Sequence, residues 1–206
     1  MRKMEVELKY IMPDEESFWR LFNDVFVRGD HFSLAIKNCR GPISRSDIYF
    51  DTQDLRLLKS GCCFRFGSKA GNLSRLTFKE KTKDKKTRVE VEDFLPTNEA
   101  IASFSGSHPS DAVVALREKI GNTPIAPKLY VYKMFFVFEA NGCEIVFGPD
   151  VYMGDENCFR RFDLEIEKET EGSDNNGLIL LGMKLEERYG LCSDFRSKYE
   201  VGMSGK

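Results

Sequence analysis

The sequence lacks several features that would assign a protein to a common functional class. Its 206 residues include only two histidines, His31 and His108, and both fall in expected loops without a partner pattern, which favours surface or structural roles. The six cysteines contain no Cys-x-x-Cys pair, which argues against a zinc site and a thioredoxin-like motif. With 31 Lys plus Arg against 33 Asp plus Glu, the formal net charge of −2 gives no field-driven attraction to nucleic acid or an acidic membrane.

Long hydrophobic runs are also missing. The N-terminus has no secretory apolar segment, and the longest apolar runs, such as residues 134–138, are far too short to cross a bilayer. We therefore expect a cytoplasmic protein with reduced thiols and no membrane partner. At this length we expect one domain over residues 1–206, able to bury about 70% of the surface of its unfolded chain. The sequence leaves open whether the protein is a monomer or a homodimer.

What the sequence has instead is a period-two alternation of apolar and polar residues, which is typical of strands. Helical periodicity is confined to three segments, at about residues 15–29, 110–121 and 178–189, and residues 97–107 are expected to form a polar loop. The sequence thus predicts an α+β, mainly β, fold with few helices and mostly short turns. Strands are expected at residues 4–11, 47–50, 62–66, 73–81, 88–95, 129–139, 143–147 and 159–168.

The polar faces of these strands carry charges in a repeated pattern. Glu-x-Glu occurs at residues 5–7, 90–92 and 165–167, each time on one strand face, and basic residues alternate in the same way over residues 75–81. A solvated sheet face would explain any one of these strands. Several together favour a wet interior, because carboxylates about 7 Å apart repel one another, and each buried unpaired ion costs several kcal/mol. We therefore expect a closed barrel whose lumen holds the charges and one small ligand.

The presence of acids and bases on one surface indicates a class of ligand. Mg²⁺ or Mn²⁺ prefers oxygen ligands, so it takes one or two carboxylates and lets substrate phosphates complete its shell. Lysine and arginine then neutralise the remaining phosphate charge. A lone cation would need only the acids, and a nucleic-acid groove mostly the bases. The mixture predicts a complex of a divalent metal with a small-molecule polyphosphate.

A series of short segments follows along almost the whole chain after Glu5-Val6-Glu7-Leu8-Lys9. These segments are Tyr49-Phe50-Asp51-Thr52 with Leu55 and Leu57, Gly61-Cys62-Cys63-Phe64-Arg65, Leu76-Thr77-Phe78-Lys79, Arg88-Val89-Glu90-Val91-Glu92, Glu165-Ile166-Glu167 and Lys198-Tyr199. In this order they resemble the CYTH superfamily, the triphosphate tunnel metalloenzymes, which includes thiamine triphosphatase-like members. The resemblance implies a closed antiparallel β-barrel of about eight strands, with flanking helices and a tunnel.

The resemblance also implies an activity and roles for individual residues. The implied function is a divalent-metal-dependent triphosphatase, acting on inorganic triphosphate or on an organic one such as thiamine triphosphate or a nucleotide, with Mg²⁺ or Mn²⁺. Alternatives are an adenylate cyclase and a non-catalytic polyphosphate-binding or nucleotide-binding protein. The end of an RNA that carries a 5′-triphosphate is also an open possibility as the substrate.

The implied catalytic residues are Glu7, Lys9 and Glu165. The implied phosphate-binding residues are Lys9, Arg65, Lys79, Arg88, Lys133 and Lys198. The implied metal ligands are Glu5, Glu7, Glu165 and Glu167, assisted by Glu90 and Glu92.

The sequence departs from the family pattern at three places. Gly67 stands where many members carry a second basic residue, and Gly148 stands where an aspartate is common. Residues 134–136 are apolar where an arginine is often found, so Phe135 and Val137 would either fill the barrel or contact an organic part of the substrate. These differences bear on the substrate and on catalytic power more than on the fold. The residues that could compensate are Lys69 for the first glycine and Glu144 or Asp150 for the second.

Overall fold

The strands expected from the alternating pattern are all present, and several are longer than predicted. A computed structural model describes residues 2–29, 36–69, 72–83, 87–140, 142–155, 157–169 and 176–205, without the side chains of residues 2–5, 69 and 169. The strands are β1 (Arg2–Ile11), β2 (Ile36–Asp51), β3 (Cys62–Lys69), β4 (Leu73–Lys81), β5 (Thr87–Pro96), β6 (Ala126–Ala140), β7 (Cys143–Gly154), β8 (Cys158–Glu169) and β9 (Cys192–Ser193).

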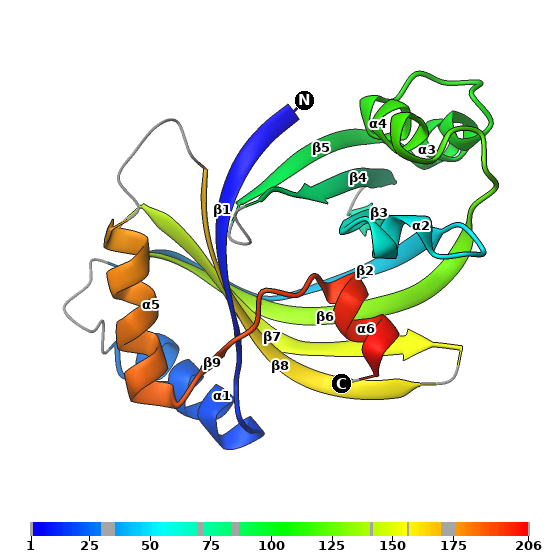
Figure 1. Ribbon diagram of the computed structural model, residues 1–206. Coiled ribbons are helices and arrows are strands. Elements are labelled where there is room, and N and C mark those ends of the chain that lie inside the picture. The colour runs from blue at the N-terminus through cyan, green and yellow to red at the C-terminus, as the bar shows by residue number, and fades with distance from the viewer. Residues whose placement is uncertain are drawn as a thin grey trace.

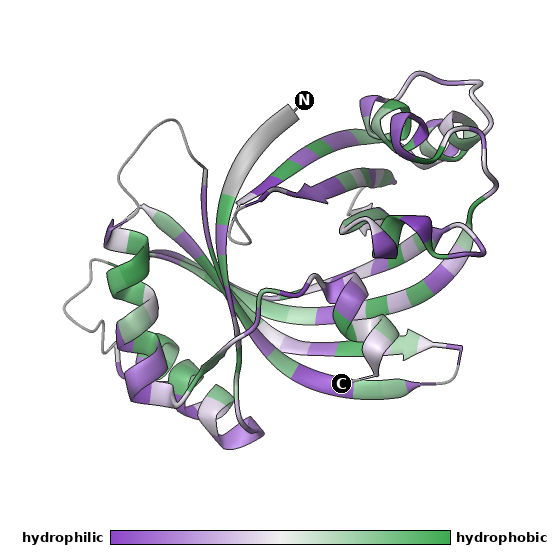
Figure 2. Cartoon of the chain, in the orientation of Figure 1, coloured by the Kyte–Doolittle hydropathy of each residue, from purple (hydrophilic) through white to green (hydrophobic). Residues whose placement is uncertain are grey.

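Eight of these strands close into an antiparallel barrel. Hydrogen-bonded neighbours follow the order β5-β4-β3-β2-β6-β7-β8-β1, and β1 pairs in turn with β5, which closes the sheet. The short β9 pairs with the end of β1. Closure leaves the long strands without free edges, and it gives the sheet an inner and an outer face along which residues alternate. Figure 2 shows this alternation of hydrophilic and hydrophobic residues along β5 and β6. The predicted fold class is confirmed.

Helices flank the barrel, and one of them lies where a loop was predicted. The prediction of a polar loop over residues 97–107 is wrong, because α3 occupies most of that segment and buries Ala100 and Ser103. No helix in the described part of the chain is long and apolar enough to cross a membrane. The helices are α1 (Glu15–Phe22), the π-helical turn η1 (Asn23–Val27), α2 (Arg56–Lys59), α3 (Thr97–Phe104), α4 (Asp111–Ile120), α5 (Asn176–Tyr189) and α6 (Lys198–Ser204).

Two apolar cores lie between the outer face of the barrel and these helices. On one side (Figure 1), α1 and α5 pack on β1, β6, β7 and β8, with Phe18 and Leu185 among the buried residues. On another side, α2, α3 and α4 pack on β3, β4 and β5, with Phe64 and Leu116 among the buried residues. Each such side chain contributes about 1.5–3 kcal/mol through burial. These two cores hold the helices on the outer face of the barrel, and much of the inner face is left for charged groups.

Helix α6 lies against the concave side of the sheet (Figure 1). Its residues Tyr199 and Val201 are fully buried in a cluster with Tyr49. The rings of Tyr199 and Tyr49 stack with centroids 5.5 Å apart, and the Tyr199 hydroxyl donates a hydrogen bond to Asp51. The helix begins with a capping box at Ser197, which fixes its N-terminus. These contacts fill part of the barrel interior and hold Lys198, the first residue of α6, at the remaining cavity.

Candidate functional site

The barrel interior contains a cavity of about 410 Å³ whose lining is mostly charged. Each of the eight long strands contributes at least one side chain, because alternate residues of every strand face inward. The side chain of Glu5 lies outside the described part of the chain. The other residues that the sequence singled out all line this cavity: Glu7, Lys9, Arg65, Lys79, Arg88, Glu90, Glu92, Lys133, Glu165, Glu167 and Lys198.

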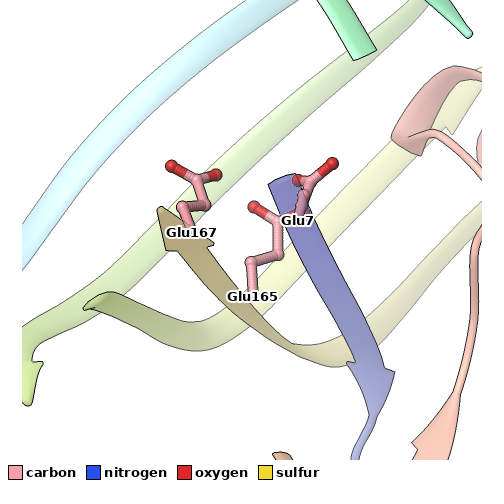
Figure 3. Close-up of side chains that lie close together, drawn as sticks. All are labelled: Glu7, Glu165 and Glu167. Atoms are coloured by element: carbon pink, nitrogen blue, oxygen red, sulfur yellow. The ribbon is translucent and has the colours of Figure 1, made fainter. Parts of the chain in front are cut away.

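Three carboxylates from neighbouring strands converge at one side of the cavity (Figure 3). Glu7 projects from β1, and Glu165 and Glu167 project from β8, where Glu167 is the register partner of Glu7. One carboxylate oxygen of each residue lies within 4.8 Å of the others. The Oε2 atom of Glu7 is buried and lies 3.1 Å from Arg88 Nε. Three converging carboxylates fit a hard divalent cation such as Mg²⁺ or Mn²⁺.

Lys9 lies between two of these carboxylates. Its Nζ atom is 2.9 Å from Glu7 Oε1 and 2.8 Å from Glu165 Oε1. Burial disfavours the ionised form of Glu7, but Lys9 and the neighbouring cations outweigh it and lower the pKa of Glu7. Burial also opposes ionisation of Glu165, yet Lys198 and Lys9 hold the pKa of Glu165 well below its usual value. Glu7 and Glu165 are therefore ionised at neutral pH, as metal ligands must be.

On strands that stand across the barrel, three cations surround the fully buried Asp47 of β2. Lys133 pairs with Asp47 Oδ2, Arg65 Nη1 lies 3.3 Å from the same oxygen, and Arg75 Nη2 lies 3.7 Å from Oδ1. Burial would raise the pKa of Asp47, but these three cations hold it far below its usual range. One carboxylate thus keeps three cations together at this side of the cavity, where they can bind an anion.

Glu90 and Glu92 lie among cations rather than beside the three-carboxylate group. Glu90 Oε1 is 3.1 Å from Lys79 Nζ and 3.9 Å from Arg65 Nη2. Glu92 Oε1 is 3.3 Å from Arg75 Nη1. Among the described residues, the carboxylates whose oxygens lie within 4.8 Å of one another are those of Glu7, Glu165 and Glu167. Glu90 and Glu92 therefore form ion pairs with cations of the same cavity.

Lys198 connects the three-carboxylate group to two further acids of the cavity. Its Nζ atom is 3.1 Å from Glu165 Oε1, 2.5 Å from Asp150 Oδ2 and 3.5 Å from Asp163 Oδ2. Burial, with a contribution from Asp163, raises the pKa of Asp150 to about 6 in spite of Lys198. Asp150 lies on β7 two residues beyond Gly148, and it faces the cavity, as does Glu144. The strand thus presents carboxylates to the lumen although Gly148 has none.

Gly67, the first departure from the family pattern, makes room for Asp47. A Cβ atom at Gly67 would lie 2.4 Å from Asp47 Oδ1, so a side chain there would displace the carboxylate. The register partner of Gly67 on β4 is Arg75, whose guanidinium reaches Asp47 from that strand. Asp47 and Arg75 are not among the site residues expected from the sequence. The alternation Arg45-x-Asp47-x-Tyr49 was the available signal, since it continues the charged inner face of β2.

Gly148, the second departure, lies where two strands approach closely. We expect Gly148→Ala to lower the free energy of unfolding by about 1–3 kcal/mol, the usual cost of overpacking. The reason is that a Cβ atom there would lie 2.1 Å from the carbonyl oxygen of Met134 and 2.7 Å from Phe135 Cα. Urea denaturation measures the change, and Gly177→Ala in α5 is the control because its Cβ would meet nothing within 4 Å. Wild-type stability of Gly148→Ala would contradict the close approach.

The fold is shared with solved structures of low sequence identity. A candidate adenylate cyclase from Bacillus halodurans matches with a TM-score of 0.69 and 16% identity, over 98% of this chain and 97% of that one. HpAC1 from Hippeastrum, a candidate adenylyl cyclase described with a dominant triphosphatase activity, matches with a TM-score of 0.65 and 15% identity, over 99% and 96%. The PH1819 protein of Pyrococcus horikoshii matches with a TM-score of 0.59 and 21% identity, over 98% and 99%.

Comparisons at the level of sequence give no such matches. No family model and no curated protein matches the chain. Each of these three structures is less than 25% identical to this chain, so the likeness shows the fold alone, a closed antiparallel barrel. They agree with the fold that the sequence predicted, a closed antiparallel barrel with flanking helices.

Proposed function

We propose that the protein is a divalent-metal-dependent triphosphatase that removes the terminal phosphate of an inorganic or organic triphosphate inside the barrel. The observation that supports it is the presence of a three-carboxylate group and a cation-rich wall around the same cavity. A divalent metal binds to carboxylates, and a phosphate chain binds to cations. A complex of the metal with a triphosphate therefore needs the three-carboxylate group and the cation-rich wall together. The triphosphatase activity described for the Hippeastrum protein of the same fold agrees with this proposal.

Each group of side chains has a part in the proposed reaction. Glu7, Glu165 and Glu167 would hold Mg²⁺ or Mn²⁺, which when bound neutralises phosphate charge and favours attack of water at the terminal phosphorus. Lys9, between Glu7 and Glu165, would lie beside the terminal phosphate. The remaining cations would orient the phosphate oxygens and stabilise the charge that they carry in the transition state. These cations are Arg65, Lys79, Arg88, Lys133 and Lys198.

Phosphate release from tripolyphosphate, thiamine triphosphate and ATP tests the proposal directly. We expect orthophosphate release from at least one of them with Mg²⁺ or Mn²⁺, and none after the metal is chelated. A cyclic AMP measurement on the ATP reaction detects the cyclase alternative. Binding of triphosphate without release of orthophosphate or of pyrophosphate would contradict the proposal, and it would favour a non-catalytic binding protein.

The pKa of Lys133 predicts a pH dependence of this activity. Burial, assisted by Arg65 and Lys198 and opposed by Asp47 and Asp150, lowers the pKa of Lys133 to about 8. The Lys133 side chain is therefore a cation below this pH and neutral above it. It attracts the phosphate of the substrate only in its cationic form. We expect kcat/KM, which reports the free enzyme, to fall by up to about tenfold per pH unit above pH ~8.

A Lys133→Arg variant is the matched control for this pH profile. A guanidinium stays protonated far above pH 8, so the fall in kcat/KM should move to higher pH. The measurement is kcat/KM from pH 6 to 10 with the substrate that the wild-type protein hydrolyses. An unchanged profile in the variant would show that Lys133 does not control the fall.

A further inference from the structure

The helices in the described part of the chain leave one region of the outer barrel face uncovered (Figure 1). It consists of the outward-facing side chains of residues 44–48 in β2, 130–134 in β6, 149–153 in β7 and 158–162 in β8, three on each strand. We call this region the outer patch. Because the four strands are neighbours in the sheet, these side chains form one continuous surface.

The outer patch reverses the usual polarity of a sheet that faces water. Residues of the same segments that point into the barrel include the charged Asp47, Lys133 and Asp150. The outward positions carry a single charge, that of Arg160, in a chain of which 31% of the residues are charged. A sheet face in contact with water normally carries the polar residues. Interface cores, by contrast, are depleted in charge and enriched in tyrosine, methionine and arginine, so this composition indicates a protein–protein interface.

The largest side chains of the outer patch are exposed. Tyr130 and Tyr132 are 47% and 42% exposed, and Met134 and Met153 are 37% and 40% exposed. Tyr130 is the register partner of Met153, so their side chains adjoin each other on the outer face. Clustered apolar surface in contact with water is unfavourable until another surface covers it.

The size of the outer patch matches what a stable dimer needs. A large side chain offers about 150–250 Å², so these two tyrosines and two methionines together expose on the order of 300 Å². None of the other outward residues of the patch is buried, and with their contribution the patch offers on the order of 700 Å². Specific interfaces bury about 600–1,000 Å² on each partner. Two outer patches in contact would therefore bury enough surface for a stable dimer.

The charges of the outer patch favour a second copy of the chain over other occupants. The Nη2 atom of Arg160 is 2.9 Å from Glu15 Oε2, and its guanidinium lies 5.0 Å from the centroid of the Phe162 ring, so the one cation of the patch is already paired. A nucleic acid would need several unpaired cations, and a different protein is commonly selected by complementary charges. Two identical faces with so little charge can meet without like-charge repulsion.

We propose that the protein forms a homodimer in which the outer patches of two copies pack face to face about a two-fold axis. In such an interface, patch residues of one copy contact patch residues of the other. Tyr132 lies at the centre of the patch, between its register partners Ser46 and Val151. Central aromatic residues carry much of the binding energy of an interface. The inference does not depend on the proposed function, because it concerns the outer side of the barrel.

Sedimentation of the wild-type protein over a range of micromolar concentrations tests the dimer. We expect a species with twice the monomer mass of 23.7 kDa, which dissociates on dilution. Interfaces of this size have affinities from micromolar to picomolar, so the dimer should be present within this range. A protein that stays monomeric at every concentration would overturn the inference.

Variants of the outer patch test whether this surface forms the interface. Tyr132→Glu and Met153→Glu each place a carboxylate in the patch, and each should raise the dissociation constant of the dimer at least about thirtyfold, as expected for a residue near the centre of an interface. Val114→Glu is the matched control, since Val114 is an exposed apolar residue of α4 outside the patch. Circular dichroism checks the fold. A dimer of wild-type affinity in both folded patch variants would overturn the inference.

Methionine oxidation locates the interface in the wild-type protein, so it gives an answer even if both patch variants misfold. Hydroxyl radicals oxidise accessible methionines, and mass spectrometry measures each site. Met134 and Met153 should be oxidised several-fold less in the dimer than in the diluted monomer. Met183 of α5, which is 58% exposed and lies outside the patch, should be oxidised equally in both. Equal oxidation of Met134 and Met153 in dimer and monomer would show that a different surface forms the dimer, and it would overturn the inference.

Discussion

Glu165→Gln should abolish metal-dependent phosphate release, with a fall in kcat on the order of a thousandfold, the upper range for loss of one preorganised charged contact. The substitution removes one of the three carboxylates that meet within 4.8 Å. It also removes the charge that Lys9 and Lys198 contact at 2.8 and 3.1 Å. Because the amide has nearly the same volume as the carboxylate, the barrel is expected to keep its structure. Phosphate release as a function of Mn²⁺ concentration measures the effect, and circular dichroism checks the fold.

The matched control for this variant is Glu118→Gln, which neutralises an exposed acid of α4 on the outside of the barrel. It should have wild-type kcat and the same dependence on Mn²⁺. Full metal-dependent turnover by the folded Glu165→Gln protein would remove Glu165 from the metal-binding group. If Glu165→Gln loses both its activity and the circular dichroism spectrum of the folded protein, Glu167→Gln replaces it as the test. Glu167 belongs to the same three-carboxylate group and lies on the same strand.

Asp47→Asn should destabilise the protein by about 3–5 kcal/mol, the cost of leaving buried charges without their partner. Asp47 is fully buried and forms ion pairs with Arg65, Arg75 and Lys133. Since the folded pKa of Asp47 is depressed, its contribution is present above the unfolded pKa of about 3.9 and is lost only as the pH falls toward the lower folded value. Urea denaturation at pH 7 measures the loss.

A double-mutant cycle identifies the cause of this destabilisation. Removing one cation together with the acid, in Asp47→Asn combined with Lys133→Met, should cost less than the sum of the two single changes. Additive costs would show that Lys133 and Asp47 do not interact. A change of less than about 0.5 kcal/mol in Asp47→Asn, the range of ordinary surface substitutions, would contradict its role as the shared partner of three cations.

The barrel and most of the cavity lining could be predicted because strand geometry is local. A two-residue period directs alternate side chains to one face whatever the rest of the fold does. In a closed sheet that face is the lumen, so charges that alternate in sequence meet in space. Glu7, Lys79 and Glu165 come from three strands far apart in the chain and nevertheless line one cavity.

The first part of β2 could not be predicted because its alternation is interrupted. Asn38 has a positive φ of 50°, and the pairing with β6 shifts register between Lys37 and Arg40 and again between Arg40 and Ile43. The strand expected at residues 47–50 therefore covers only its regular end, and the inward-facing residues before it were missed. Arg40, which lines the cavity, belongs to that missed part.

The sequence alone also could not predict which charged side chains form ion pairs with one another. Glu90 pairs with Lys79 because the register of β4 against β5 places them opposite each other, and nothing local fixes that register. A motif that contains two glutamates therefore does not distinguish metal ligands from residues that orient cations. The same holds for Lys198, which enters the cavity from α6 and contacts Glu165 from a helix that no periodicity predicted.

Crystals grown with Mn²⁺ and tripolyphosphate would test the central claim most directly. Anomalous scattering locates Mn²⁺ without reference to any assumed ligand. The account predicts an anomalous peak between the carboxylates of Glu7, Glu165 and Glu167, with phosphate density extending from it toward Arg65 and Lys133 inside the barrel. A peak outside the cavity, or phosphate bound to the outer surface while the lumen stays free of it, would contradict the account.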